Sequence, residues 1–405
     1  MANTKEKNGF LLIDKPTGPS SHDIIYQLRK ITGIKKIGHS GTLDPFASGL
    51  LLIAIEDATR VLRHYVGLDK TYEAILRLGA TSDTQDRTGK IEEGSQPEAG
   101  QPLAENKHQA CPEYSQGITK SQIENILKSF IGKQKQIPPM YSAKKIDGQR
   151  LYKLARKGQT IKRNAQDIEI YDIKLISYDL GLITINCKVS SGTYIRTLTH
   201  DIGAKLGCGA YLEELKRTAI GDFKLENAVS ISHSGGSVLA TNRIHSNDTD
   251  TGLQNDNVLT KTNWRKNFIP MKTVLVSGTF DGVHKGHKNY FQQARKLGHR
   301  LFAIVARDSI VKKIKNKTPK YSEKERVKQV KQCKEVDRVY LGVDGSEEKI
   351  YDFVADIKPD IIALGYDQKA YTENLEKEMK KRLISVKITK LKPFKPEKYK
   401  SSTLN

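Results

Sequence analysis

A single aspartate, Asp44, stands in a run of small and turn-forming residues between Gly38 and Leu50. No second acidic residue lies in that run, so the paired carboxylates of general acid and base catalysis are missing from it. A lone carboxylate on a loop rich in glycine and proline suits a nucleophile or an electrostatic catalyst. Asp44 is therefore a candidate reactive group, although Asp44-Pro45 by itself is also typical of an ordinary turn.

A second pattern with chemical meaning is the pair of histidines in His284-Lys285-Gly286-His287, which follows the apolar run 274–276. Glycines let a backbone approach phosphates, and a helix N-terminus offers free N–H groups and a favourable dipole to an anion. Two close histidines can also bind a metal, but no third ligand accompanies them. We expect a phosphate site after a buried strand.

The segment that must position Asp44 has a mixed α/β texture over residues 8–229. Runs rich in β-forming residues (51–55, 72–78 and 182–189) alternate with helical patterns at 21–31 and 192–203. The strands and helices do not follow a strict βαβ order, which favours an α+β sheet domain.

The segment that carries the histidines, residues 271–405, alternates strand and helix patterns. Its apolar runs 301–306 and 361–364 are typical of central parallel strands that are buried on both faces. We expect an α/β doubly wound, Rossmann-like domain.

Between the two domains, residues 230–270 are rich in Ser, Asn, Asp, Thr and Gly, and we expect a polar linker there. A second polar stretch, about 93–117, is interpreted as a flexible insertion in the first domain. A length of 405 residues agrees with two or three domains.

The charge of +22 favours a polyanionic partner such as RNA, although lysine enrichment for solubility gives the same composition. Four scattered cysteines without a CxxC pair argue against a zinc site or a disulfide framework. With no signal peptide or long apolar run, we expect a cytoplasmic protein without membrane contact. The oligomeric state is not specified by the sequence.

Five separated motifs of the first domain resemble the TruB family of tRNA pseudouridine synthases and occur in the family's order. In addition to the Asp44 loop, they are residues 14–21, 70–72, 137–144, 191–196 and 206–210. The resemblance implies an isomerase that converts a T-loop uridine of tRNA to pseudouridine without a cofactor or a metal.

The resemblance also implies roles for individual residues. Asp44 is the catalytic carboxylate, Arg196 pairs with it, and Tyr72 stacks on the flipped uracil and handles the proton that leaves C5. The residues expected to contact RNA are His39, Lys15, Tyr141 and Lys144. The basic run 132–163 overlies the family's RNA-binding region. No PUA-type RNA-binding module is recognised after it.

The second domain resembles the HxGH nucleotidyltransferases, and within them the archaeal-type FAD synthases, at 278–287, 305–315, 360–368 and 401–403. This resemblance implies FMN adenylylation with ATP and Mg²⁺. A cytidylyltransferase that uses CTP and a phosphorylated alcohol shares the same framework, and one half of the chain could also only bind, as an RNA chaperone does. The implied nucleotide-binding residues are Gly278, Thr279, Phe280, His284, Gly286, His287, Lys312, Asp367, Gln368, Ser402 and Thr403.

Overall fold

The computed structural model describes residues 8–93, 118–231 except 143, 147, 156, 157 and 160, and 258–394 except 369–371 and 373. The chain forms two compact units, which divide between Ile269 and Pro270. Each is described by itself. The predicted insertion at 93–117 lies outside the described residues from position 94 onward.

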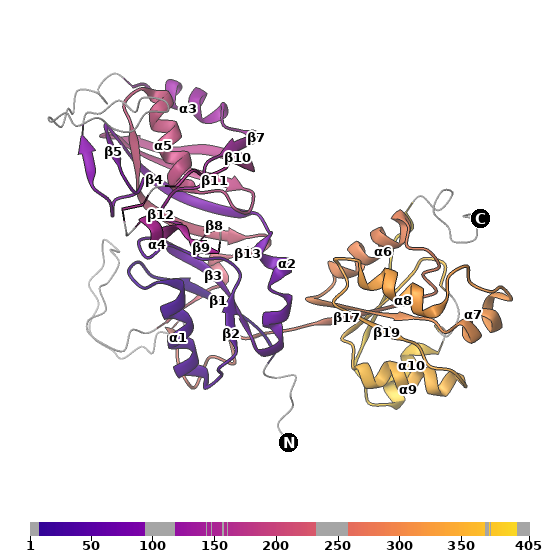
Figure 1. Cartoon of the computed structure of the whole chain (residues 1–405). Coiled ribbons are helices and arrows are strands. Elements are labelled where there is room, and N and C mark those ends of the chain that lie inside the picture. Colours follow the sequence, from indigo (N-terminus) through magenta and orange to yellow (C-terminus); the bar gives the residue numbers. More distant parts are fainter. Residues whose placement is uncertain are drawn as a thin grey trace. The chain divides into compact units, whose positions relative to one another are not determined.

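The first unit is built on a 12-stranded mixed sheet with the central order β15-β14-β1-β3-β12-β4-β11-β10-β7 (Figure 1). β13, β16 and β2 pair with β12, β1 and β3. The strands are β1 (Gly9–Lys15), β2 (Ile37–His39), β3 (Ser48–Ile55), β4 (Lys70–Leu78), β7 (Gly132–Gln136), β10 (Gln166–Asp179), β11 (Leu182–Val189), β12 (Ala210–Ile220), β13 (Phe223–Lys224), β14 (Val229–Ile231), β15 (Val258–Leu259) and β16 (Ile269–Pro270).

Helices and two small hairpins complete this unit. The hairpins pair β5 (Ala80–Ser82) with β6 (Ile91–Glu93), and β8 (Lys145–Ile146) with β9 (Gln149–Arg150). The helices are α1 (Ser21–Thr32), α2 (Arg63–Val66), α3 (Lys120–Lys128), α4 (Leu151–Ala155) and α5 (Ile195–Leu206), with 3-10 turns at Glu56–Val61 and Leu225–Asn227.

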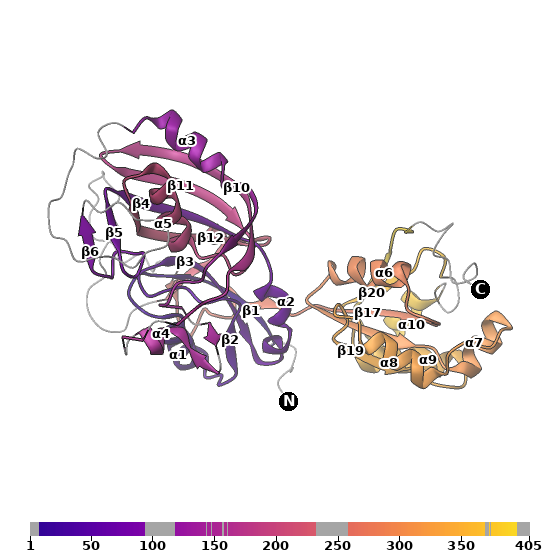
Figure 2. The same ribbon diagram turned by 45° about the horizontal axis from the view of Figure 1, so that its top comes forward.

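Two hydrophobic clusters fill the unit. In one, β4, β10 and β11 pack against α3 and α5, and in the other, β1 and β3 pack against α1. Figure 2 shows α3 and α1 at opposite ends of the unit. The strict in–out alternation of burial along β4 explains why its sequence forms a sheet strand with one face in the core. The predicted α+β class is confirmed.

The second unit is a five-stranded parallel sheet in the order β19-β18-β17-β20-β21. Its strands are β17 (Thr273–Gly278), β18 (Arg300–Val305), β19 (Arg338–Leu341), β20 (Ile361–Leu364) and β21 (Lys387–Lys390). Its helices are α6 (Lys285–Arg295), α7 (Asp308–Lys315), α8 (Glu323–Lys331), α9 (Glu347–Ile357) and α10 (Leu375–Lys381).

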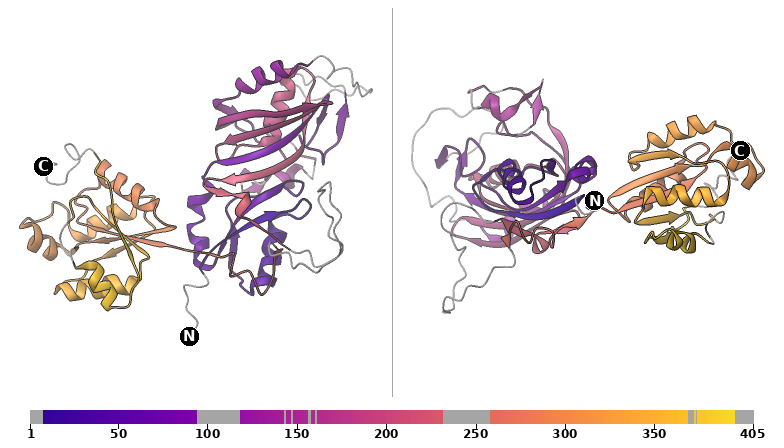
Figure 3. Two further views of the ribbon diagram at one scale, coloured as in Figure 1. Left: turned by 180° about the vertical axis from the view of Figure 1, so that it is seen from behind. Right: turned by 90° about the horizontal axis from the view of Figure 1, so that it is seen from below.

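Helices cover both faces of this sheet (Figure 3). Side chains of α6 and α8 form a core on one face, and side chains of α9 and α10 form a core on the other. The predicted doubly wound class is confirmed. Because the strand order reverses between β17 and β20, the carboxyl ends of these two strands mark the ligand-binding crevice of such folds.

The structure differs from the sequence-based expectation within the segment 230–270. β14 and β15 join the large sheet, and Trp264 is buried in the α1 core with an edge contact to Phe268. The described residues 258–269 therefore belong to the first unit. Composition misses this because a two-residue strand and a single tryptophan carry no periodicity.

Candidate functional site

The loop that carries Asp44 connects β2 to β3 and is fixed from the side of α1. The Ser21 hydroxyl accepts a hydrogen bond from the Leu43 N–H (2.8 Å) and donates one to the Leu43 carbonyl (3.0 Å). The Gly18 N–H donates to the Pro45 carbonyl at 2.8 Å. The backbone on each side of Asp44 is thus held, which limits the positions that its carboxylate can take.

A buried arginine from β12, Arg217, holds the same loop from below. Its guanidinium donates to the carbonyls of Leu50 (2.8 Å), Gly41 (3.1 Å) and Thr42 (3.4 Å). In the sheet register Arg217 lies directly opposite Tyr72 of β4. Arg217 was not predicted from the sequence, because only the pairing of β12 with β4 places it beneath the loop.

Arg196, in the first turn of α5, joins two carboxylates. It donates to Asp44, as expected from the sequence, and its Nη1 donates to Asp86 Oδ2 at 3.1 Å. The side chains of Arg196 and Asp86 are 7% and 2% exposed, whereas that of Asp44 is 37% exposed. Asp44 is therefore the member of this triad that a substrate can reach.

Asp86 itself was not predicted. Its carboxylate also accepts hydrogen bonds from the Thr84 hydroxyl and from the Thr88 N–H, both at 2.9 Å. It lies in the polar turn that follows β5, where nothing in the sequence distinguishes it from a solvent-exposed turn residue. The structure identifies it as the buried counter-ion that orients Arg196.

The electrostatic environment shifts the pKa values of Asp44 and Tyr72. Burial raises the pKa of the Asp44 carboxyl, while the charges of Arg196 and Lys15 lower it and that of Asp86 raises it further. Burial also raises the pKa of the Tyr72 phenol, although the neighbouring Arg217 opposes the shift. Tyr72 is therefore a neutral phenol at pH 7, able to stack and to donate a proton.

The expected contact of Lys15 with RNA does not agree with the structure, because Lys15 is completely buried and cannot reach an RNA phosphate. Its ammonium donates to the carbonyls of Pro16 and Pro19, each at 2.8 Å, and to that of Pro45 at 3.5 Å. Burial lowers its pKa to about 8. Lys15 ties the segment after β1 to the Asp44 loop.

We predict that Lys15→Met destabilises the protein without changing the salt dependence of RNA binding. The carbonyls left without their donor cost about 1–3 kcal/mol of unfolding free energy. A lost phosphate contact would reduce the slope of log affinity against log salt by about 1. Urea unfolding and filter binding at several salt concentrations measure the two effects. A reduced salt slope of binding in the Lys15→Met variant would show that Lys15 contacts an RNA phosphate after all.

The other residues expected to contact RNA occupy separate places in the unit. His39 ends β2 and is half-buried, and burial and the charge of Arg217 lower its pKa. Tyr141 and Lys144, after β7, are also half-buried. Their roles stay predictions.

In the second unit, the histidine pattern forms the N-terminus of α6. His284 is the N-cap residue, and its Nδ1 accepts from the Gly286 N–H at 3.1 Å. The rings of His284 and His287 stack with centroids 3.9 Å apart. Burial, together with His284, lowers the pKa of His287 to about 4, so His287 is neutral at pH 7 before a ligand binds.

The turn before these histidines is tightly packed. Phe280 is buried with a φ of 51°, in the left-handed region, and its ring contacts His287 edge-on. A Cβ on Gly278 would lie 2.9 Å from the Phe280 ring. Glycine is therefore required at position 278, where β17 ends.

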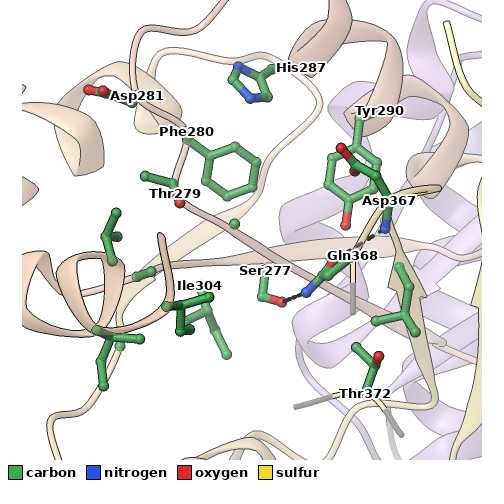
Figure 4. Close-up of a pocket in the computed structure, with 18 of the residues that line it drawn as sticks. Ser277, Thr279, Phe280, Asp281, His287, Tyr290, Ile304, Asp367, Gln368 and Thr372 are labelled. Carbon is green, nitrogen blue, oxygen red and sulfur yellow. Dashed lines mark hydrogen bonds between the residues drawn. The ribbon is translucent and has the colours of Figure 1, made fainter. Parts of the chain in front are cut away.

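A pocket of about 960 Å³ opens at the carboxyl ends of β17 and β20. In Figure 4, Phe280, Asp281 and His287 lie toward one end of it and Asp367, Gln368 and Thr372 toward the other. Most predicted nucleotide-binding residues line it, namely Gly278, Thr279, Phe280, His284, Gly286, His287, Asp367 and Gln368.

Gln368 has both ends of its amide engaged. Its Nε2 donates to the Ser277 hydroxyl at 2.9 Å, and its Oε1 accepts from the Gly365 N–H at 3.3 Å. It therefore joins the ends of β17 and β20, while the neighbouring Asp367 is exposed.

Lys312 differs from the expectation. It is exposed on α7 and is not among the residues that line the pocket, whereas Val311, Ile314 and Lys315 of the same helix do line it. Helical periodicity turns position 312 away from the face that carries 311, 314 and 315. Ser402 and Thr403 lie outside the described residues.

Two side chains organise the pocket rim without having been predicted to do so. Arg326 is completely buried and donates to the carbonyls of Thr279 and Ala306, at the ends of β17 and β18. The Asp281 carboxylate accepts from the N–H groups of Lys320 (2.7 Å) and Tyr321 (2.9 Å). Asp281 thus anchors residues 315–321, whose Lys315, Lys317 and Lys320 line the pocket.

Across the described residues, no group of three or more His, Cys, Asp or Glu side chains is placed to hold a metal ion. No helix among them is long and apolar enough to cross a membrane.

The first unit is a pseudouridine synthase domain, as two family models indicate. Residues 29–195 match the family model of the TruB family pseudouridylate synthase N-terminal domain, and residues 196–246 match that of the tRNA pseudouridylate synthase B C-terminal domain. The chain belongs to the TruB family. The second unit, over residues 275–404, matches the cytidylyltransferase-like family model.

Curated relatives of the first unit are named tRNA pseudouridine synthase B. One from Geobacter sulfurreducens is 41% identical over 224 residues, which cover 55% of this chain and 68% of that protein. One from Clostridium novyi is 43% identical over 225 residues, with coverages of 56% and 71%. The alignment with an Opitutus terrae relative, at 40% identity, covers 56% of this chain and 87% of that protein.

Solved structures with similarity include a Cbf5–Nop10–Gar1 complex. It is 29% identical with a TM-score of 0.41, and the alignment covers 56% of this chain and 53% of that one. A lipopolysaccharide core biosynthesis protein from Thermoplasma volcanium is 38% identical with a TM-score of 0.29, and the alignment covers 31% of this chain and 98% of that one.

Proposed function

We propose that the first unit isomerises a T-loop uridine of tRNA to pseudouridine. The observation that carries the proposal is the half-exposed Asp44 carboxylate, held by buried Arg196 on a loop fixed from two sides. The names of the curated relatives and the net charge of +22 support tRNA as the substrate.

The reaction breaks the N-glycosidic bond, turns the uracil and forms a bond from C5 to the same sugar carbon. Asp44 supplies the ionised carboxylate at the reacting nucleotide, and Arg196 stabilises its charge. Tyr72 offers a neutral aromatic ring to the flipped base, and its phenol relays a proton: the oxygen takes the proton that leaves C5 while the hydroxyl gives its own to N1, which carries a proton in the product. Each of these steps uses protein groups alone.

We propose that His39, Tyr141 and Lys144 contact the RNA around the flipped uridine. Their partial exposure leaves them open to a ligand. Lysine would bind phosphate, and tyrosine would stack on an unpaired base.

Incubation with an unmodified tRNA transcript tests the first proposal. Pseudouridine is mapped by carbodiimide modification and primer extension. A transcript with cytidine in place of the T-loop uridine is the control. We expect one product, at the T-loop position, that is absent from the control transcript. Product at another position would overturn the assignment of the uridine, and RNA bound but left unmodified would favour a chaperone role.

We propose that the second unit transfers a nucleotidyl group, and that the reaction is the adenylylation of FMN by ATP. The observation that carries this proposal is the pocket at the carboxyl ends of β17 and β20. The N-terminus of α6 and three lysines, Lys315, Lys317 and Lys320, line the same pocket. These groups suit a polyphosphate chain and the pyrophosphate that leaves.

Part of the pocket lining is apolar. Val311 and Ile314 of α7, Val343 after β19, and Ile350 and Phe353 of α9 line it. A flat aromatic ring system would bury apolar surface there, and a small phosphorylated alcohol would not. This observation favours FMN over glycerol phosphate or ethanolamine phosphate as the acceptor.

Mg²⁺ would neutralise the nucleotide phosphates in this reaction. Asp281 and Asp367 are the carboxylates among the described lining residues, and both oxygens of Asp281 already accept backbone hydrogen bonds. The donor set therefore fits an ion held mainly by phosphate oxygens and water, as is common for Mg²⁺. His284, His287 and the lysines would hold the phosphates.

Four parallel incubations test the second proposal: ATP or CTP, each with FMN or with glycerol phosphate. Chromatography of the nucleotide products reads the result. We expect FAD from ATP and FMN only, and none with His287→Ala. Turnover of CTP with glycerol phosphate would establish the cytidylyltransferase alternative.

We predict that Asp281→Asn raises KM for the nucleotide about tenfold, because the amide keeps one acceptor oxygen, so that one charge-assisted bond of about 1.5–3 kcal/mol is weakened, the other is lost and the lysine segment is loosened. The kcat value should change less, since the histidines keep their places. Initial rates against ATP concentration measure both constants. Asp222→Asn, in an exposed turn of the first unit, is the control. A fall confined to kcat would contradict the anchoring role.

The cysteines among the described residues, Cys187, Cys208 and Cys333, are buried free thiols. They fit the reducing cytoplasm, which we propose as the compartment.

A further inference from the structure

Helix α1 presents a row of three exposed side chains, His22, Tyr26 and Lys30. They are spaced by four residues and so share one side of the helix. The other side, with Ile24 and Leu28, is buried in the core against β1 and β3. The Tyr26 side chain is 57% exposed, and the Lys30 ammonium lies 4.5 Å from its ring centroid. We call these three residues the α1 row.

The α1 row begins beside the catalytic loop. The segment that enters α1 is bonded to that loop through the Gly18 N–H and the Pro45 carbonyl, at 2.8 Å. Burial and the charge of Arg217 lower the pKa of His39, which precedes the Asp44 loop, and the charge of His22 lowers it further. A polymer whose nucleotide occupies the Asp44 site can therefore extend along the row.

The charges around the row have one predominant sign. Residues 21–36 contain four cationic side chains and a single acidic one, Asp23. The Asp23 carboxylate is occupied in the capping box of Ser20, from which it accepts the N–H and the hydroxyl. Lys36 is paired with Asp57, whereas Lys30 and Lys35 are exposed. The surface complements a polyanion.

We propose that the α1 row is a second RNA-binding surface of the first unit, on which Tyr26 stacks with an unpaired base and Lys30 binds a phosphate of the strand that leaves the Asp44 site. The proposal rests on the RNA-modifying function proposed above. An aromatic ring beside a lysine suits single-stranded nucleotides, because every base has a face to stack and a phosphate next to it.

The unit provides a matched control of the same composition. Tyr171 on β10 is 41% exposed, with the ammonium of Lys188 5.9 Å from its ring centroid. Burial raises the pKa of Tyr171, and the negative charges of Asp69 and Glu169 raise it further, so two acidic groups act on this pair. The two pairs differ in charge environment and not in residue type.

The test compares Tyr26→Ala/Lys30→Ala with Tyr171→Ala/Lys188→Ala in the full chain. Single-turnover pseudouridine formation on an unmodified tRNA transcript gives the RNA concentration for half-maximal rate and the rate at saturation. Binding of the same transcript is measured separately in the Asp44→Asn background, over a series of salt concentrations. Urea midpoints establish that both double variants are folded.

For the α1 double variant we expect at least about a tenfold higher half-maximal RNA concentration, from the loss of one stack and one phosphate contact. The salt slope of binding should fall by about 1, and the rate at saturation should be retained. The control should match the unchanged protein. Equal affinity and equal salt slope in all three proteins would overturn the proposal.

The two proposals fail in different ways. If the transcript binds but is not modified, the proposed reaction fails, and the binding series alone still decides the role of the α1 row. If the transcript neither reacts nor binds, both proposals are overturned.

Discussion

Asp44→Asn is expected to abolish pseudouridine formation while leaving RNA binding and folding intact. Loss of the reacting carboxylate should lower the single-turnover rate by at least about 10³-fold, because nucleophiles and electrostatic groups account for that much or more of catalysis. The amide has nearly the same volume and keeps an oxygen that can accept from Arg196. Arg196 also retains its ion pair with Asp86.

The variant should be no less stable than the unchanged protein. Burial raises the pKa of Asp44 in the folded state above its ordinary value. Stability from such a group is present below the ordinary pKa and is lost as pH rises through the raised one. At pH 7 the ionised carboxylate therefore destabilises the fold, and asparagine removes that effect.

The measurements are pseudouridine formation at saturating RNA and urea unfolding at pH 7. Asp222→Asn, in an exposed turn of the same unit, is the matched control and should keep full activity. Residual activity within about tenfold of the control would show that Asp44 is not the reacting group. A lowered urea midpoint would show instead that its charge stabilises the loop.

Asp86→Asn is expected to reduce both stability and rate, and to shift the pH dependence of the reaction. The change removes one of the two carboxylates that hold buried Arg196, and breaking such a buried pair costs about 3 kcal/mol. A less constrained Arg196 should slow the reaction by about 10²-fold, as small misplacements do.

The pH profile separates this role from a purely structural one. The negative charge of Asp86 raises the pKa of Asp44. Because Asp44 acts as the ionised form, activity is lost as pH falls through its pKa. Removing the Asp86 charge lowers that pKa and should move the acidic limb of the rate profile to lower pH.

Two measurements test these expectations: the rate at saturating RNA between pH 4.5 and 8, and urea unfolding. Rates are compared only at pH values at which urea unfolding shows that the protein stays folded. Asp83→Asn, in the same turn but exposed, is the control. If Asp86→Asn had a normal rate and an unshifted acidic limb, the assigned coupling of Asp86 to Asp44 through Arg196 would be contradicted.

Much of the fold was predictable because the elements are local and strongly patterned. The alternation along residues 70–78 and the apolar runs 301–306 and 361–364 each determine a strand and its burial. The helical pattern at 21–31 predicts α1, which Ser20 caps. The short strands β14 and β15 were missed because they exist only through pairing, β14 with β1 and β15 with β14.

The sites were predictable where a motif carries the whole chemical group. Asp44 and the α6 histidines lie in continuous runs whose glycines and prolines already indicate a turn or a helix start. Lys15 and Lys312 were assigned roles that the structure does not support, because a sequence does not reveal whether a lysine is buried or which face of a helix it occupies.

The sequence by itself determined the two fold classes and placed Asp44 in a turn and the α6 histidines at a helix start, since each depends on neighbouring residues. Only the tertiary structure decided that Asp86 shares Arg196 with Asp44. It also decided that Arg217 supports the Asp44 loop by a hydrogen bond to Gly41, from which 176 residues separate it in the chain. Such contacts depend on sheet register and on the docking of α5, both of which are properties of the packed core. A buried charge acquires its partner only when that core forms.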